Sequence, residues 1–148
     1  MEKRLKHVLD VRDIPPSYHL CKPGKPLLKS LVGAGAPSPH ESEVIEYLRG
    51  GVPCGLCPDG QILYDILRTD TRVRIDDVLA ADGLQDVGAS IVYTDGEWTW
   101  AGATIYYIKH YHLPIPDELV AFAKSNHWQI DKAKIDLSKL NLFSFFDE

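Results

Sequence analysis

Two cysteines separated by two residues, Cys54 and Cys57, form the pattern in this sequence that could carry chemistry most directly. Such a pair can supply half of a tetrahedral zinc site, or act as a redox couple when the first thiol begins a helix. The residues that follow are Pro-Asp-Gly, which favours a turn over a helix and argues against redox chemistry. A zinc site would need further ligands, for which His110 and His112 are the candidates.

The spacing of these histidines limits the zinc hypothesis. His110 and His112 are two residues apart, so on a helix they would point about 200° apart and could not both reach one metal ion. We therefore interpret Cys54 and Cys57 as small buried side chains. The alternative is a small zinc-binding protein or enzyme that uses both cysteines with one of the two histidines. We expect no cofactor and no catalysis, because the chain also lacks a nucleophile elbow and a phosphate-binding loop.

Acidic residues gather between residues 76 and 97, where six carboxylates occur without any lysine or arginine. The whole chain has a net charge of −5, although residues 1–36 carry seven basic against three acidic side chains. An acidic surface repels phosphate, so nucleic acid is not an expected partner. A basic protein is the physical complement. The alternative is a solvated acidic face without a partner.

Aromatic residues adjoin this acidic stretch. Trp98 and Trp100 alternate with polar residues, so they share one face of a predicted strand. Rings beside acids are typical of protein-binding surfaces, and buried rings are equally typical of a core. We predict that a partner binds through the following residues: Asp82, Asp86, Asp95, Glu97 and Trp98.

The segment 90–128 contains the patterns from which we predict the central elements of the fold. Residues 91–93 and 97–100 flank a Thr-Asp-Gly turn, in which Gly96 suits the positive φ of a tight hairpin. A helix is expected from about residue 105 to 112. Pro116 then suits the first turn of another helix, where the next two acidic residues lie at its positive end.

Upstream, Ser38-Pro39-His40-Glu41 has the pattern of a capping box and predicts a helix that Gly50-Gly51 closes in a left-handed conformation. A Pro-Asp-Gly turn predicts a second hairpin over residues 52–67. The remaining expected elements are strands at 7–11, 71–75 and 129–131 and a short helix at 78–81.

Together these elements predict one α+β domain across the 148 residues, with an antiparallel or mixed sheet built from two β-hairpins and packed with about three helices. Residues 1–37 are expected to be partly irregular, 38–128 to form the main unit, and 129–148 to dock on it as a tail. The Phe-rich end of this tail could instead form a homodimer. With no apolar membrane segment, no secretory signal and only three cysteines, we expect a cytoplasmic protein.

A resemblance adds to this prediction. The segment T-D-G-E-W-T-W at 94–100, the Tyr-Tyr pair at 106–107 and Tyr-His-Leu-Pro at 111–114 resemble a group of small uncharacterised bacterial proteins. Residues 42–51 are similar to their first helix, while 1–37 lie outside the resemblance. It implies the fold unit and no particular activity. In size and acidity alone, the chain is also similar to immunity proteins of bacterial toxin systems, which implies the neutralisation of a basic toxin.

Overall fold

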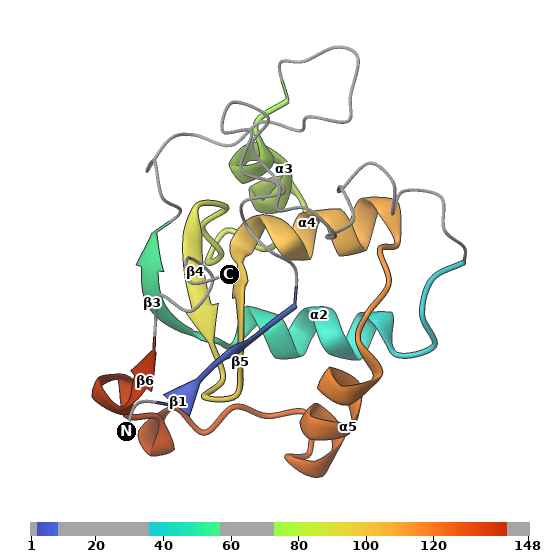
Figure 1. The fold of residues 1–148 in the computed structure, drawn as a ribbon. Coiled ribbons are helices and arrows are strands. Elements are labelled where there is room, and N and C mark those ends of the chain that lie inside the picture. The colour runs from blue at the N-terminus through green and yellow to red at the C-terminus, as the bar shows by residue number, and fades with distance from the viewer. Residues whose placement is uncertain (1–2, 9–35, 57–72, 142–148) are drawn as a thin grey trace, which may run out of the picture.

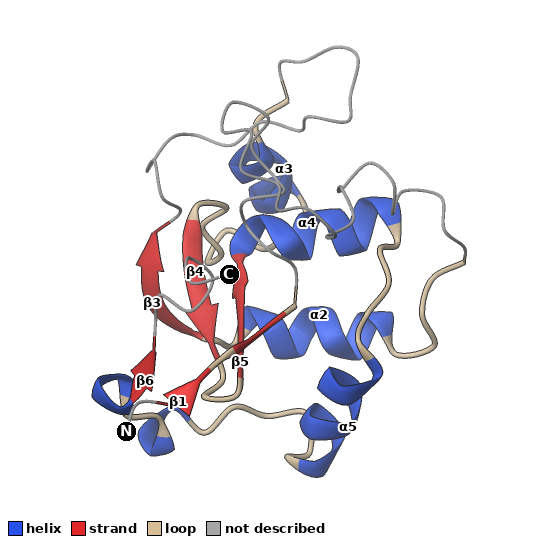
Figure 2. Cartoon of the chain, viewed as in Figure 1, coloured by secondary structure: helices blue, strands red, loops and turns tan. Residues whose placement is uncertain are grey.

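The computed structural model describes residues 3–8, 36–56 and 73–141. Helices and strands form one α+β domain, in which three antiparallel strands pair side by side and one of the four helices, α4 (Gly102–Tyr111), packs on them, while the others pack on α4 or on one another (Figures 1 and 2). The strands are β3 (Val52–Leu56), β4 (Ile91–Thr94) and β5 (Trp98–Ala101). The helices are α2 (Glu41–Arg49), α3 (Ile75–Ala81), α4 (Gly102–Tyr111) and α5 (Asp117–Ser125).

Two short N-terminal strands extend this arrangement. β2 (Lys6–His7) lies parallel to β5, so the sheet has the order β2-β5-β4-β3. β1 (Lys3–Arg4) pairs in parallel with β6 (Leu140–Asn141). The beginning and the end of the described chain therefore lie side by side (Figure 1).

The predicted hairpin at the centre of the chain is confirmed. β4 and β5 are antiparallel, with Tyr93 opposite Trp100, and Gly96 in their turn has a φ of 93°. The second predicted hairpin is only partly visible: its first strand is β3, which pairs antiparallel with β4, and residues 57–72 lie outside the described residues.

Helix α4 lies at the centre of the core. It follows β5 without an intervening loop, and every residue from Gly102 to Ile108 is buried. A Cβ atom at position 102 would lie 2.0 Å from the carbonyl oxygen of Gly88, so only glycine fits at this junction. Both neighbouring indoles are also buried, since Trp98 and Trp100 are 5% and 0% exposed. The two rings therefore serve the core.

The helix predicted from the capping box is present as α2, but the predicted N-terminal cap and the predicted left-handed C-terminal end are wrong. The helix begins at Glu41, because the Ser38 carbonyl accepts a hydrogen bond from the Glu41 amide at 3.0 Å in a preceding turn. Gly50 has a φ of −86°, so it is not left-handed. Gly51 is needed for another reason: a Cβ atom there would lie 2.5 Å from the indole of Trp100.

Two strand predictions are also corrected. Ile75, expected to end a strand, is the first residue of α3 and is fully buried in the core. Residues 129–131 form no strand, because the Asp131 side chain accepts a hydrogen bond from the Ala133 amide and caps the 3-10 turn η3 (Lys132–Lys134). The described part of the chain contains no helix that is long and apolar enough to cross a membrane.

Candidate functional site

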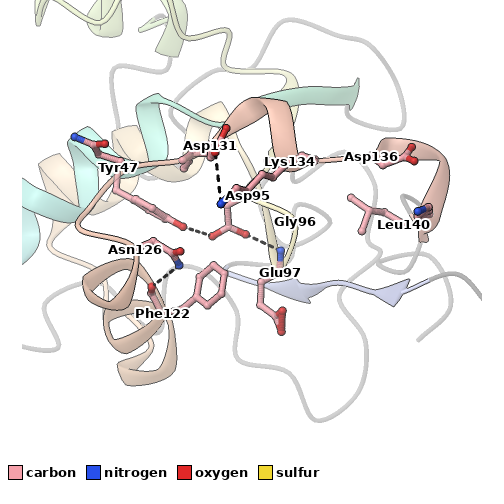
Figure 3. Close-up of a pocket in the computed structure, with 14 residues that line it drawn as sticks. Tyr47, Asp95, Gly96, Glu97, Phe122, Asn126, Asp131, Lys134, Asp136 and Leu140 are labelled. Carbon is pink, nitrogen blue, oxygen red and sulfur yellow. Dashed lines mark hydrogen bonds and ion pairs between the residues drawn. The ribbon is translucent and has the colours of Figure 1, made fainter.

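A groove of about 540 Å³ opens to solvent at the turn between β4 and β5 (Figure 3). Four parts of the chain form it: the hairpin turn, α2, the C-terminal end of α5, and the segment 129–140. Its apolar lining residues are Phe122, Ile130, Ile135 and Leu140. Its charged lining residues are Asp95, Glu97, Asp131, Lys134, Asp136 and Lys139.

The carboxylate of Asp95 fixes the floor of this groove. One oxygen, Oδ2, accepts a hydrogen bond from the Tyr47 hydroxyl at 2.5 Å. The other, Oδ1, accepts from the amides of Glu97 and Trp98 at 2.8 and 2.6 Å. Asp95 is only 8% exposed. These hydrogen bonds fix the conformation of the hairpin turn and join the turn to helix α2.

The Tyr47 side chain is a permanent donor in this arrangement. Burial, followed by the hydrogen bond and the charge of Asp95, raises the pKa of Tyr47 far above its usual value. The phenol therefore stays protonated and donates a hydrogen bond to Asp95. All three donors to Asp95 are neutral, and no basic side chain of the described residues lies within 4.0 Å of it.

The segment 129–140 supplies the outer rim. Asp131 and Asp136 each cap a single 3-10 turn by accepting a backbone hydrogen bond, at 3.2 and 3.0 Å. Lys134 pairs with Asp131 at 3.8 Å. Four carboxylates and two lysines line the groove, so the formal charge of its described lining is −2. The groove combines apolar walls with a negatively charged rim.

The structure separates the five residues predicted to bind a partner. Asp95 and Glu97 line the groove. Trp98 lies behind the turn at 5% exposure, with the Lys6 ammonium 5.6 Å from its ring centre. Because its ring is buried, Trp98 supports the turn from inside and is not part of an exposed surface.

Asp82 and Asp86 form ion pairs within the chain and do not line the groove. Asp82 lies 2.9 Å from His110 and 3.6 Å from Lys109; burial raises the pKa of Asp82, but these two partners lower it more. Asp86 lies 3.0 Å from Arg49, whose hydrogen bond lowers the pKa of Asp86. Both charges are therefore partly neutralised by the protein itself.

The candidate zinc ligands are also placed apart where the structure describes them. Cys54 lies on β3, and burial, partly offset by a hydrogen bond with Thr99, raises the pKa of its thiol to about 11. His110 pairs with Asp82, as described above. His112 pairs with Glu41 at 3.0 Å, at the end of α4 that points away from β3 (Figure 1).

Cys57 lies outside the described residues, so the zinc hypothesis stays a prediction. Within the parts of the chain that the structure places, no three side chains of histidine, cysteine, aspartate or glutamate cluster as metal ligands would.

Several groove residues have no clear signal in the sequence. Tyr47 and Asp95 meet across 48 positions, which no local pattern could indicate. Phe122 lies on α5, the helix that follows Pro116, and no local pattern assigns it to a groove. Two Asp-x-x-Lys repeats, at 131–134 and 136–139, match the two capped turns and are the one local signal for the rim. No family model, no curated protein and no solved structure matches this chain.

Proposed function

We propose that this protein is a non-enzymatic binding module that holds a segment of a basic protein in the groove at the β4–β5 turn. An immunity protein that neutralises a basic toxin would act in this way. The observation that carries the proposal is the composition of one surface hollow: apolar side chains from α5 and the segment 129–140 lie beside four carboxylates.

The apolar walls supply the contact area for such a segment. Phe122, Ile130 and Ile135 are all partly buried, so each keeps some surface that a partner can cover. Apolar area removed from water contributes about 25 cal/mol per Å². An aromatic or aliphatic pocket inside a polar rim is the usual composition of a protein-binding centre.

The charge of the rim favours a basic partner. Asp131 and Asp136 are exposed, and Glu97 is half-buried beside the turn. Complementary charges raise the rate of association and weaken the binding of acidic competitors. Binding through this rim should therefore decrease as the salt concentration rises.

The same lining gives little support to catalysis. Among the described residues that line the groove there is no histidine, cysteine, serine or threonine, the side chains that most often act as nucleophile or base. Asp131 and Asp136 already accept backbone hydrogen bonds. The groove also opens to solvent, whereas most catalytic sites exclude water.

The test is a capture experiment with matched charge reversals. Glu97→Lys changes the sign of one rim charge, and Asp77→Lys makes the same change on α3, where Asp77 is 70% exposed. The immobilised wild-type protein should capture a basic protein from the source cells, release it at high salt, and protect cells in which a captured toxin is expressed. Asp77→Lys should behave like the wild type and Glu97→Lys should lose the partner. Equal capture by both variants would contradict the proposal.

A further inference from the structure

Asp95 is a buried carboxylate that has no cationic partner among the residues that the structure describes. It is 8% exposed, and its three hydrogen-bond donors are a phenol and two backbone amides, all neutral. Charges that proteins bury are normally paired with an opposite charge or a metal ion, because desolvation is costly. In this protein the carboxylate lines a groove that opens to solvent, and it is not enclosed in the core.

The carboxylate retains capacity for one more donor. An ionised carboxyl group has about four acceptor positions on its two oxygens. Oδ1 accepts two hydrogen bonds and Oδ2 accepts one, from Tyr47, within the described part of the chain. Figure 3 shows the Asp95 side chain between Tyr47 and Glu97, among the residues that line the groove.

Neither lysine of the groove satisfies this charge. Lys134 pairs with Asp131 at 3.8 Å, and its side chain is 83% exposed. Lys139 forms no ion pair with Asp95. The apolar lining beside the carboxylate, formed by Phe122 and Ile135, suits the hydrocarbon stem of a long cationic side chain.

We propose that the groove recognises one lysine or arginine side chain of its protein partner, whose cationic end pairs with Asp95 while its stem lies against the apolar wall. This inference rests on the proposed function and names what the groove selects. A lysine or arginine contributes its charge and its hydrogen bonds together, and such charge-assisted bonds are about twice as strong as neutral ones. The groove would accordingly discriminate against a neutral side chain of the same shape.

An NMR titration tests the cation site without the partner. The probes are N-acetyl-arginine amide, N-acetyl-lysine amide and the neutral isostere N-acetyl-citrulline amide, added to the 15N-labelled chain. The two cationic probes should shift the amides of Gly96 and Glu97 in a saturable way. Citrulline should bind about tenfold more weakly, the factor expected for one charge-assisted contact. Equal binding of citrulline, or shifts confined to other surfaces, would overturn the inference.

Three variants assign the effect to Asp95. Asp95→Asn keeps an oxygen for the two amides and removes the charge, so it should lose the preference for arginine over citrulline. Tyr47→Phe keeps the charge and removes a competing donor, so it should bind arginine at least as tightly as the wild type; this variant decides the matter if Asp95→Asn does not fold. Asp77→Asn removes one carboxylate on α3, outside the groove, and should not weaken binding. An unchanged arginine preference in Asp95→Asn, or its loss in Tyr47→Phe, would refute the assignment.

The outcome is distinguishable from a failure of the proposed function. If a captured partner depends on Glu97 but binds wild type and Asp95→Asn equally, the binding module stands and the Asp95 site falls. If N-acetyl-arginine amide binds at Asp95 but no captured protein depends on the groove, the cation site is supported and its role in binding a protein partner is refuted.

Discussion

The contact between Tyr47 and Asp95 should be a large local source of stability. Asp95→Ala removes the acceptor for the Tyr47 hydroxyl and for the two amides of the hairpin turn. The hydroxyl would lose its acceptor at a buried position, since Tyr47 is 3% exposed. Tyr47→Phe is a milder change, because it removes the donor together with its need for an acceptor.

Typical energies give the size of the effect. A hydrogen bond to a charged group contributes about 1.5–3 kcal/mol, and a buried polar group left unpaired costs about 1–3 kcal/mol. The turn amides can reach water after the change, so their loss is partly compensated. We expect Asp95→Ala to lower the free energy of unfolding by about 3–4 kcal/mol and Tyr47→Phe by about 1–2 kcal/mol. The double variant should lose about 1–2 kcal/mol less than the sum, because the residues share one contact.

Urea unfolding followed by circular dichroism measures these values, with the slope compared between variants to check that the unfolding transition is unchanged. An additive double variant would refute the contact as an energetic unit. A loss below about 0.5 kcal/mol for Asp95→Ala, the size of an ordinary surface substitution, would show that Asp95 does not fix the turn.

Three further predictions concern other parts of the domain. Gly51→Ala should destabilise the protein by about 1–3 kcal/mol in urea unfolding, because the new methyl group overlaps the indole of Trp100. Iodoacetamide should alkylate Cys54 slowly at pH 8, with a rate that rises about tenfold per pH unit, because the pKa of this thiol is raised to about 11. Arg49→Gln should raise the pKa of Asp86, because the Arg49 guanidinium lowers this pKa in the wild type; NMR titration measures the change. The Arg49 pair stabilises the fold above the unfolded pKa of Asp86, about 3.9, so the stability difference between wild type and variant should shrink as the pH falls below 4.

Each of these predictions has a control. Gly55→Ala adds the same methyl group on β3, where none of the described residues except its chain neighbours lies within 4 Å, and should leave stability nearly unchanged. The alkylation requires a chain whose two other cysteines are replaced by serine; a rate at pH 8 equal to that of a free cysteine peptide would contradict the buried thiol. For the acid titration, a stability difference that persists at pH 2 would show that the Arg49 side chain acts through packing and not through its charge.

Local sequence patterns were sufficient where one short segment determines the structure. The Asp95-Gly96 turn, flanked by β-forming residues, predicted the central hairpin, and Pro116 marked the N-terminal boundary of α5. Glycines were harder to interpret. Gly51 and Gly102 look like flexible breaks in the sequence, but each is required because a neighbour approaches too closely for a side chain.

The candidate site was less accessible to sequence reasoning, because it depends on contacts between distant segments. Clustering in sequence suggested that Asp82, Asp86 and Asp95 share a surface. In the fold, Asp82 pairs with Lys109 and His110. Asp86 pairs with Arg49, and Asp95 accepts a hydrogen bond from Tyr47. Such partners lie far away in the chain, and local charge counts cannot reveal them. The apolar wall from the segment 129–140 was missed for the same reason.

Site-specific photo-crosslinking tests the central claim, that the groove is the protein-binding site, most directly. A benzoylphenylalanine replaces Ile135 on the groove wall or, as control, Asp77 on α3, and irradiation in the source cells is followed by mass spectrometry of the linked peptides. The groove position should link to one segment of a basic protein that contains a lysine or arginine, and the control position should not. Links from both positions to the same mixture of proteins, or from the control position alone, would contradict the claim.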